Sequence, residues 1–204
     1  MLRPVGLVYG TPHPCPIGLC GDPREARTRA YGKWQSVRLD LFDICVLSDL
    51  NSMPDLADQL PVLLPRILAW ANAQADSILH QGDPLNAAGL TLASRVGVAQ
   101  PERIRILTVT TVPAPEDPEL QRIAVEQNLI GPSTAGLTLG YGIFILNGCL
   151  TPRLLAHECR HVYQYEVAGS IEAFLPLYLQ QIAEFTYHRA PYELDARAWE
   201  WVVL

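Results

Sequence analysis

The chain has 204 residues and a formal net charge of −6, and 49% of its residues are hydrophobic while only 18% are charged. This balance predicts one compact, soluble domain. An acidic chain with scattered arginines offers no broad field for phosphate backbones, so nucleic acid is not an expected partner. The longest apolar stretch, residues 60–71, is interrupted by Pro65 and Arg66, and no stretch reaches the roughly 18–20 residues of a membrane span.

The amino terminus and the cysteines favour a cytoplasmic protein. Residues 1–8 contain no apolar core of the length that a secretory signal needs. Five cysteines, an odd number at irregular spacing, do not form a disulfide framework. Cys45 and Cys149 stand among apolar neighbours and are expected in the core.

We expect two regions, an irregular arm or lid over residues 1–36 and a single domain over residues 37–204. Alternating prolines around residues 11–18 disfavour regular structure. His13, Cys15 and Cys20 lie in this arm, but they form no CxxC pair and match no standard zinc spacing. The arm therefore suggests a loop anchored by buried sulfur rather than a second metal site.

Hydrophobic periodicity predicts helices and strands in the first two thirds of the chain. Apolar residues at three- and four-residue intervals indicate helices, and alternation indicates strands. In chain order the predicted elements are a helix from about residue 52 to 81, a helix over 85–96 that ends at Gly97, a strand over 103–110, a helix over 118–127 and one strand over 137–146 containing Gly140 and Gly142.

Three helices are predicted in the last third. Thr151 is a natural N-cap, Pro152 suits the first helical position, and Gly169 can end the helix between them. A second helix over residues 171–187 and a third from residue 191 to the C-terminus follow. Residues 109–112 and the strand at Gly140 are expected to be two members of a small twisted sheet. With these helices beside the sheet, the sequence predicts an α+β fold.

The first of these helices carries His157, Glu158 and His161 in an HExxH arrangement. Residues four apart lie about 40° apart around a helix and one turn along it, so both imidazoles can bind one metal ion. Glu158 lies about 100° from His157 and can reach a water molecule at that metal. The motif predicts a Zn²⁺ site with a glutamate as general base.

The surroundings of the motif argue against two ordinary surface histidines. Apolar side chains flank it, namely Leu154, Leu155, Val162 and Ala168. Buried polar groups need partners, and a metal ion would supply one. Cys159, inside the motif, is expected to pack in the core rather than to react.

The residues leave the third ligand open. Glu166 is nine positions beyond His157 and so lies on the opposite side of the helix, and Glu172 is too far along the axis. Glu184 on the returning helix and Glu193 at the start of the third helix remain as candidates.

HExxHxxQ followed by the segment Pro191-Tyr192-Glu193-Leu194-Asp195-Ala196 resembles the gluzincin group of zinc metallopeptidases, particularly the small bacterial minigluzincins. The resemblance covers roughly residues 137–200. It implies a zincin-like fold and Glu193 as third ligand. It also implies that the strand from Gly140 to Ile145 forms the sheet edge that binds extended peptide.

The chain departs from the gluzincin pattern at Arg197, where gluzincins often have an aspartate that orients a histidine. Asp195 would either replace that aspartate or be the third ligand itself. Among several tyrosines and one histidine near the motif, Tyr192 and His188 lie nearest to Glu193 in sequence. They are the predicted donors to the oxyanion of a tetrahedral intermediate.

The leading hypothesis is a zinc-dependent peptidase that acts on a peptide or protein. His157, His161 and Glu193 would hold Zn²⁺, and Glu158 would take a proton from the attacking water and pass it to the leaving amine. An alternative is a binding or regulatory protein that keeps the scaffold with a chiefly structural metal. A third possibility is an interaction module without a metal.

Overall fold

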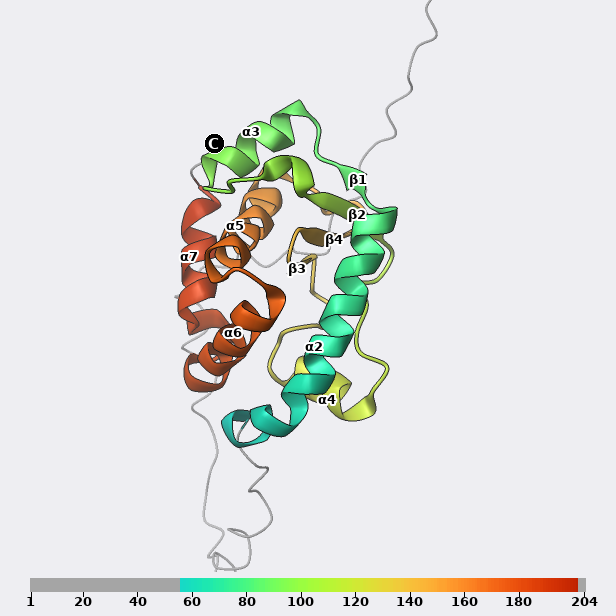
Figure 1. Cartoon of the computed structure of the whole chain (residues 1–204), viewed down its shortest axis with the longest axis vertical. Coiled ribbons are helices and arrows are strands. Elements are labelled where there is room, and N and C mark those ends of the chain that lie inside the picture. Colours follow the sequence, from blue (N-terminus) through green and yellow to red (C-terminus); the bar gives the residue numbers. More distant parts are fainter. Residues whose placement is uncertain (1–55, 202–204) are drawn as a thin grey trace, which may run out of the picture.

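The computed structural model describes residues 56–201. The expected arm over residues 1–36, the start of the predicted domain and Cys45 lie outside these residues. The elements in chain order (Figure 1) are α2 (Leu56–Gln81), β1 (Asp83–Pro84), α3 (Ala87–Arg95), the 3-10 turn η2 (Pro101–Arg103), β2 (Arg105–Val109), α4 (Pro118–Glu126), β3 (Gly136–Leu139), β4 (Gly142–Leu146), α5 (Pro152–Ala168), α6 (Ile171–Phe185), η3 (Tyr187–Arg189) and α7 (Pro191–Trp199).

The four strands form one mixed sheet in the order β1-β2-β4-β3. β2 and β4 are parallel, with Arg105 opposite Gly142, whereas β1 and β3 are antiparallel to their neighbours. Six α-helices and this sheet, counted over residues 56–201, confirm the α+β class. β4 is internal and β3 forms one edge of the sheet.

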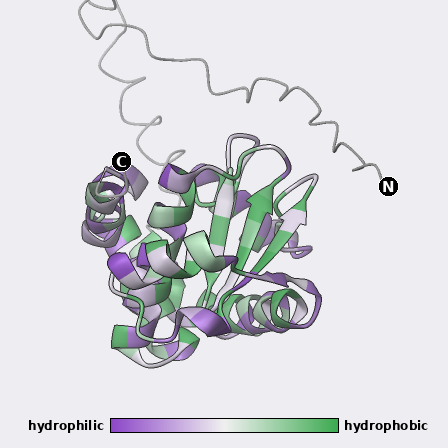
Figure 2. Cartoon of the chain, turned by 90° about the horizontal axis from the view of Figure 1, so that it is seen from above, coloured by the Kyte–Doolittle hydropathy of each residue, from purple (hydrophilic) through white to green (hydrophobic). Residues whose placement is uncertain are grey.

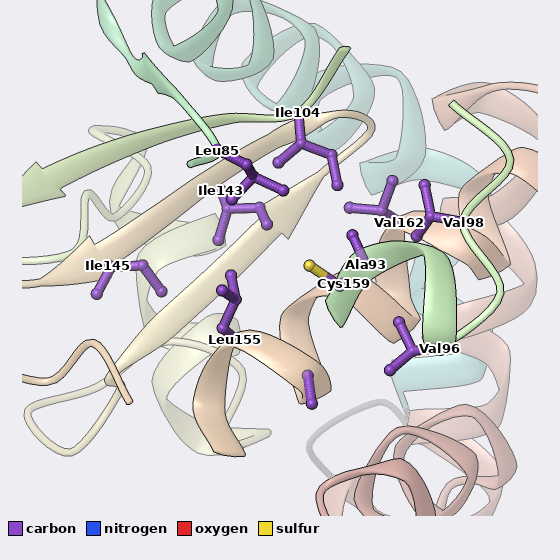
Figure 3. Packing of buried hydrophobic residues seen from close by; sticks show 11 residues of the cluster. Leu85, Ala93, Val96, Val98, Ile104, Ile143, Ile145, Leu155, Cys159 and Val162 are labelled. Atoms are coloured by element: carbon purple, nitrogen blue, oxygen red, sulfur yellow. The ribbon is translucent and has the colours of Figure 1, made fainter. Parts of the chain in front are cut away.

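Helices cover both faces of the sheet (Figure 1). Ile143 and Ile145 of β4 pack with residues of α3 and α5, as Figure 3 shows for Ala93, Leu155, Cys159 and Val162. On the opposite face Gly142 lies against α2, where an added Cβ would come within 2.9 Å of Ile78. A strand buried on both faces reads as a continuous apolar run, as β4 does, and Figure 2 shows hydrophobic residues in green along the strands of the sheet.

The expectation of one strand over residues 137–146 is wrong, because the segment is a hairpin. Gly140 has a φ of +62°, and Leu139 pairs with Gly142 across a two-residue turn. Glycine adopts this left-handed backbone without a Cβ penalty, so the chain reverses there. The expectation that Gly140 to Ile145 forms the sheet edge is also wrong, because β4 lies between β2 and β3 and the edge belongs to β3.

The predicted helix boundaries in the last third are close to those observed. The Thr151 hydroxyl accepts a hydrogen bond from the Leu154 amide, and Gly169 ends α5 with a φ of +96°. α6 ends at Phe185 and α7 at Trp199, each a few residues before the predicted end. Earlier in the chain β2 ends at Val109, so residues 110–112 lie beyond the strand.

Two further expectations concern the membrane and the cysteines. Over the described residues, no helix combines the length and the apolar character that crossing a membrane requires. Cys149 and Cys159 are buried, which confirms that Cys149 lies in the core. Burial raises the pKa of the Cys159 thiol to about 12, which fits the expected packing role.

Candidate metal centre

Two histidines of α5 and one glutamate of α7 meet in the interior. The helical spacing sets the rings of His157 and His161 side by side, with their Nε2 atoms 3.2 Å apart. α7 packs against α5 and brings Glu193, which is only 1% exposed, to both rings. Its carboxylate oxygens lie 3.3 Å from His161 Nε2 and 3.6 Å from His157 Nε2. The three residues together could hold a metal ion, since their ligand atoms all lie within 4.8 Å of one another.

A hydrogen-bond relay orients the His161 ring. Gln164 Nε2 donates to the Tyr192 carbonyl at 3.0 Å and to Asp195 Oδ2 at 2.8 Å, so the Gln164 amide nitrogen faces two acceptors. Its Oε1 therefore faces His161 Nδ1, 2.8 Å away, and Nδ1 must carry the hydrogen. Arg160 holds Asp195 from the other side with two hydrogen bonds. In the neutral ring the Nε2 lone pair then points toward Glu193.

A second carboxylate orients His157 in the same way. Glu200 Oε1 lies 3.0 Å from His157 Nδ1, and its other oxygen accepts from Arg153 Nε at 2.5 Å. A carboxylate accepts hydrogen bonds and cannot donate, so His157 Nδ1 is the donor. Metal-binding histidines commonly donate their second ring nitrogen to a carboxylate or carbonyl, which raises the basicity of the ring.

The two Nε2 lone pairs and the Glu193 carboxylate therefore converge, with no N–H or O–H group between them to bridge them. Within residues 56–201, Glu193 Oε2 is the buried side-chain oxygen without a hydrogen-bond partner, although Arg197 Nη1 lies 3.5 Å away. Burial alone would raise the pKa of Glu193, but the neighbouring imidazoles of His161 and His157 outweigh it and lower the value to about 2. Burial opposes protonation of His161, yet Glu193 raises its pKa. Both shifts have one cause, the attraction between the Glu193 carboxylate and a protonated imidazole, and a metal ion bound by the neutral rings would supply the same positive charge.

Replacing Glu200 by glutamine is expected to weaken the binding of a metal ion at this site roughly 10- to 100-fold, since the substitution removes the charge that holds His157 Nδ1–H. Competition against a chromophoric chelator measures the affinity. The control is Glu126→Gln, which removes a carboxylate from an exposed pair with Arg122. An affinity equal in all three proteins would contradict the orienting role of Glu200.

Glu158 lies beside His157, His161 and Glu193, the candidate metal-binding cluster, and is held by β3. It is 4% exposed, and its Oε2 accepts a 2.7 Å hydrogen bond from the Thr138 hydroxyl. A Cβ added at Gly136 would lie 2.4 Å from Glu158 Oε1, so the glycine at this position gives the carboxylate its space. The edge strand thus sets the position of the side chain that the HExxH motif assigns as general base.

A cavity of about 70 Å³ opens onto the cluster, and a second of about 210 Å³ adjoins it at His157 and Glu158. Three tyrosines line the first cavity, namely Tyr165, Tyr178 and Tyr187. Tyr178 of α6 donates to Glu193 Oε1 at 2.8 Å, and Tyr187 of η3 lines both cavities. Burial, with the nearby Glu193 charge, raises the pKa of both hydroxyls, so both remain hydrogen-bond donors at neutral pH.

The structure does not bring every predicted site residue to these cavities. Tyr192 packs its ring on Phe174 and reaches the site only through its backbone carbonyl. His188 is exposed, and neither residue lines either cavity. Of the alternative ligands, Glu184 is exposed and Asp195 is taken up by Arg160 and Gln164. Neither belongs to the group of three that could hold a metal.

Sequence reasoning missed Thr138, Tyr178 and Glu200. Glu200 had a local signal, because it follows Glu193 by seven residues and so lies on the same side of the helical turn. Thr138 and Tyr178 had none, since β3 and α6 reach the site only through tertiary packing.

Comparisons with protein-family models, with curated proteins and with solved structures find no match to this chain.

Proposed function

We propose that this chain is a zinc-dependent peptidase of zincin-like fold, in which His157, His161 and Glu193 hold Zn²⁺ and Glu158 is the general base. The observation that carries the proposal is the convergence of two oriented Nε2 lone pairs on a buried carboxylate with an unpartnered oxygen. The HExxH spacing and the gluzincin-like segment around Glu193 support the same assignment.

The spacing of the donor atoms suits zinc. Atoms that bind one tetrahedral Zn²⁺ at about 2.0–2.1 Å lie roughly 3.3–3.4 Å from one another. Here the two Nε2 atoms are 3.2 Å apart, His161 Nε2 lies 3.3 Å from Glu193 Oε1, and His157 Nε2 lies 3.6 Å from Glu193 Oε2. With one ligand atom from each residue, the three atoms lie within 4.8 Å of one another. Two imidazoles and one carboxylate are a common protein ligand set of catalytic zinc, which leaves a further position open.

Zinc would supply Lewis-acid chemistry at this point, polarising a carbonyl group and acidifying water. The chain supplies the rest. Glu158, held by the Thr138 hydroxyl at the border of the two cavities, accepts the proton of the attacking water and delivers it to the leaving amine. Tyr187 faces the same space with a hydroxyl that stays protonated, so it replaces Tyr192 and His188 as our candidate oxyanion donor.

The edge strand offers a place for extended peptide. Leu146 N donates to Ala135 O, and hydrogen-bonded pairs alternate along an antiparallel ladder. The backbone N–H and C=O groups of Leu137 and Leu139 therefore make the hydrogen bonds to β4. The backbone groups of Gly136 and Thr138 then point to the free side of β3, beside Glu158. A substrate added there as a strand would place its backbone next to the general base.

Removing the metal tests the proposal as a whole. Purified protein is expected to contain about one zinc ion per chain, to hydrolyse unfolded casein, to lose that activity with 1,10-phenanthroline and to regain it with added zinc. Zinc at 100 times its dissociation constant should also add about 2.7 kcal/mol to the free energy of unfolding. Metal-free protein that cleaves casein at the same rate would refute the proposal, and bound zinc without any hydrolysis would favour a chiefly structural metal.

A further inference from the structure

An apolar cavity of about 100 Å³ adjoins the candidate active site. It lies between α2, α4, α6 and β3. Five residues line both this cavity and the one at the metal-binding cluster: Leu129, Leu137, Leu139, Leu175 and Tyr178. The two cavities therefore share a wall. One side of the wall faces the cavity that Glu193 lines, and the other side faces the apolar cavity.

The lining chemistry restricts what can enter this apolar cavity. None of its lining residues carries a charge, and the hydroxyl of Tyr178 already donates to Glu193. An ionised side chain would lose its hydration there without gaining a partner, whereas an aliphatic or aromatic side chain would leave water at no polar cost. At about 100 Å³ this cavity is smaller than the apolar cavities of about 150 Å³ that take up benzene, so it has room for no more than one apolar side chain.

The sheet geometry connects the apolar cavity with a bound peptide. Successive side chains of a strand point to opposite faces. Thr138 points to the α5 face and touches Glu158, whereas Leu137 and Leu139 lie on the opposite face with α2 and α6. A peptide added beside β3 would continue this alternation, so its alternate side chains would lie over the apolar cavity.

We propose that the apolar cavity is the subsite for a large aliphatic or aromatic side chain of the peptide substrate. The proposal rests on the proposed peptidase function and adds a substrate class to it. Specificity would come from the cavity on one face of β3, and the reacting groups would lie on the other.

Internally quenched peptide pools test the subsite with the full-length, zinc-loaded protein. One position at a time is fixed as Ala, Leu, Phe or Asp, and the other positions are mixed. At one position we expect kcat/KM for Leu or Phe to exceed that for Ala roughly 10- to 200-fold, the range that hydrophobic pockets achieve, with Asp lowest.

Two variants assign the preference to this cavity. Ala124 lines the apolar cavity and neither of the two cavities at Glu158, and Ala124→Leu would fill the apolar cavity. We expect this variant to lose the advantage of the Leu and Phe pools over the Ala pool. Val125→Leu, at the exposed neighbouring position of α4, is the matched control. Ile130→Phe fills the same cavity from the following loop and replaces Ala124→Leu if that variant fails to fold.

The outcomes separate the subsite from the peptidase activity. Equal cleavage of the Ala, Leu and Phe pools, or a preference that survives both filling variants, would overturn the subsite and leave the activity standing. If no pool is cleaved, the peptidase proposal fails, and fluorescence anisotropy of labelled peptides still tests the cavity. Tighter binding of Leu than of Ala peptides that Ala124→Leu abolishes would support the subsite, and equal binding would overturn it.

Discussion

Replacing Glu158 by glutamine is expected to lower kcat for peptide hydrolysis by roughly 10²- to 10⁴-fold, the range that a positioned general base contributes. Glutamine keeps the length of the side chain, and its amide oxygen can still accept from Thr138. It cannot take a proton from water. Because Glu158 is not among the three residues that could hold the metal, the variant should keep its zinc.

Turnover, zinc content and thermal unfolding of the same preparation distinguish the explanations. Glu172→Gln is a suitable control, since it changes an exposed glutamate that bonds to Asn72, away from both cavities. A Glu158→Gln variant that hydrolyses casein as fast as the parent would refute the general-base assignment. Loss of zinc together with turnover would instead make Glu158 part of the metal site.

Replacing Glu193 by glutamine is expected to lower zinc affinity by more than about 100-fold, beyond the range for residues that only orient a ligand. The glutamine amide has no negative charge to offset the two positive charges of a zinc ion that both imidazoles bind. Glu193 is the only carboxylate among the three grouped residues. The zinc-dependent gain in stability, about 2.7 kcal/mol at 100 times the dissociation constant, should disappear at the same zinc concentration.

Two matched variants decide between the carboxylates that the sequence left open. Glu184→Gln alters an exposed residue of α6 and should bind zinc like the wild type. Asp195→Asn should weaken zinc binding only about 10- to 100-fold, because Asp195 acts on His161 through Gln164. Full zinc binding by Glu193→Gln, with loss in either of the other two, would transfer the third ligand to that residue.

The two histidines of the site can be predicted from the sequence, because helix geometry depends on local backbone hydrogen bonds. His157 and His161 face the same way for the reason that any residues four apart on a helix do, and Thr151, Pro152 and Gly169 mark the ends of that helix. The burial of the motif also followed from its apolar neighbours. Here the backbone hydrogen bonds of a single element decide the arrangement.

The hairpin marks a case in which a local signal was present and misinterpreted. The sequence pattern predicts one strand that runs through Gly140 and Gly142, whereas Gly140 turns the chain at a positive φ. That turn makes β3 the edge strand and places Thr138 and Gly136 against Glu158. Apolar and polar residues alternate in the same way along one long strand and along two short strands of a hairpin, so this alternation does not distinguish the two.

The completion of the metal-binding cluster depended on contacts between elements. Glu184 and Glu193 were both plausible third ligands, because the returning helix and the one after it can each reach the level of His157. Packing of α7 on α5 buries Glu193 beside both rings and leaves Glu184 in solvent. Spacing along one helix thus sets two candidate ligands. The positions of the third candidate ligand, Glu193, and of its neighbours Tyr178 and Glu200 depend on how separate helices bury their apolar faces, which no single stretch of sequence encodes.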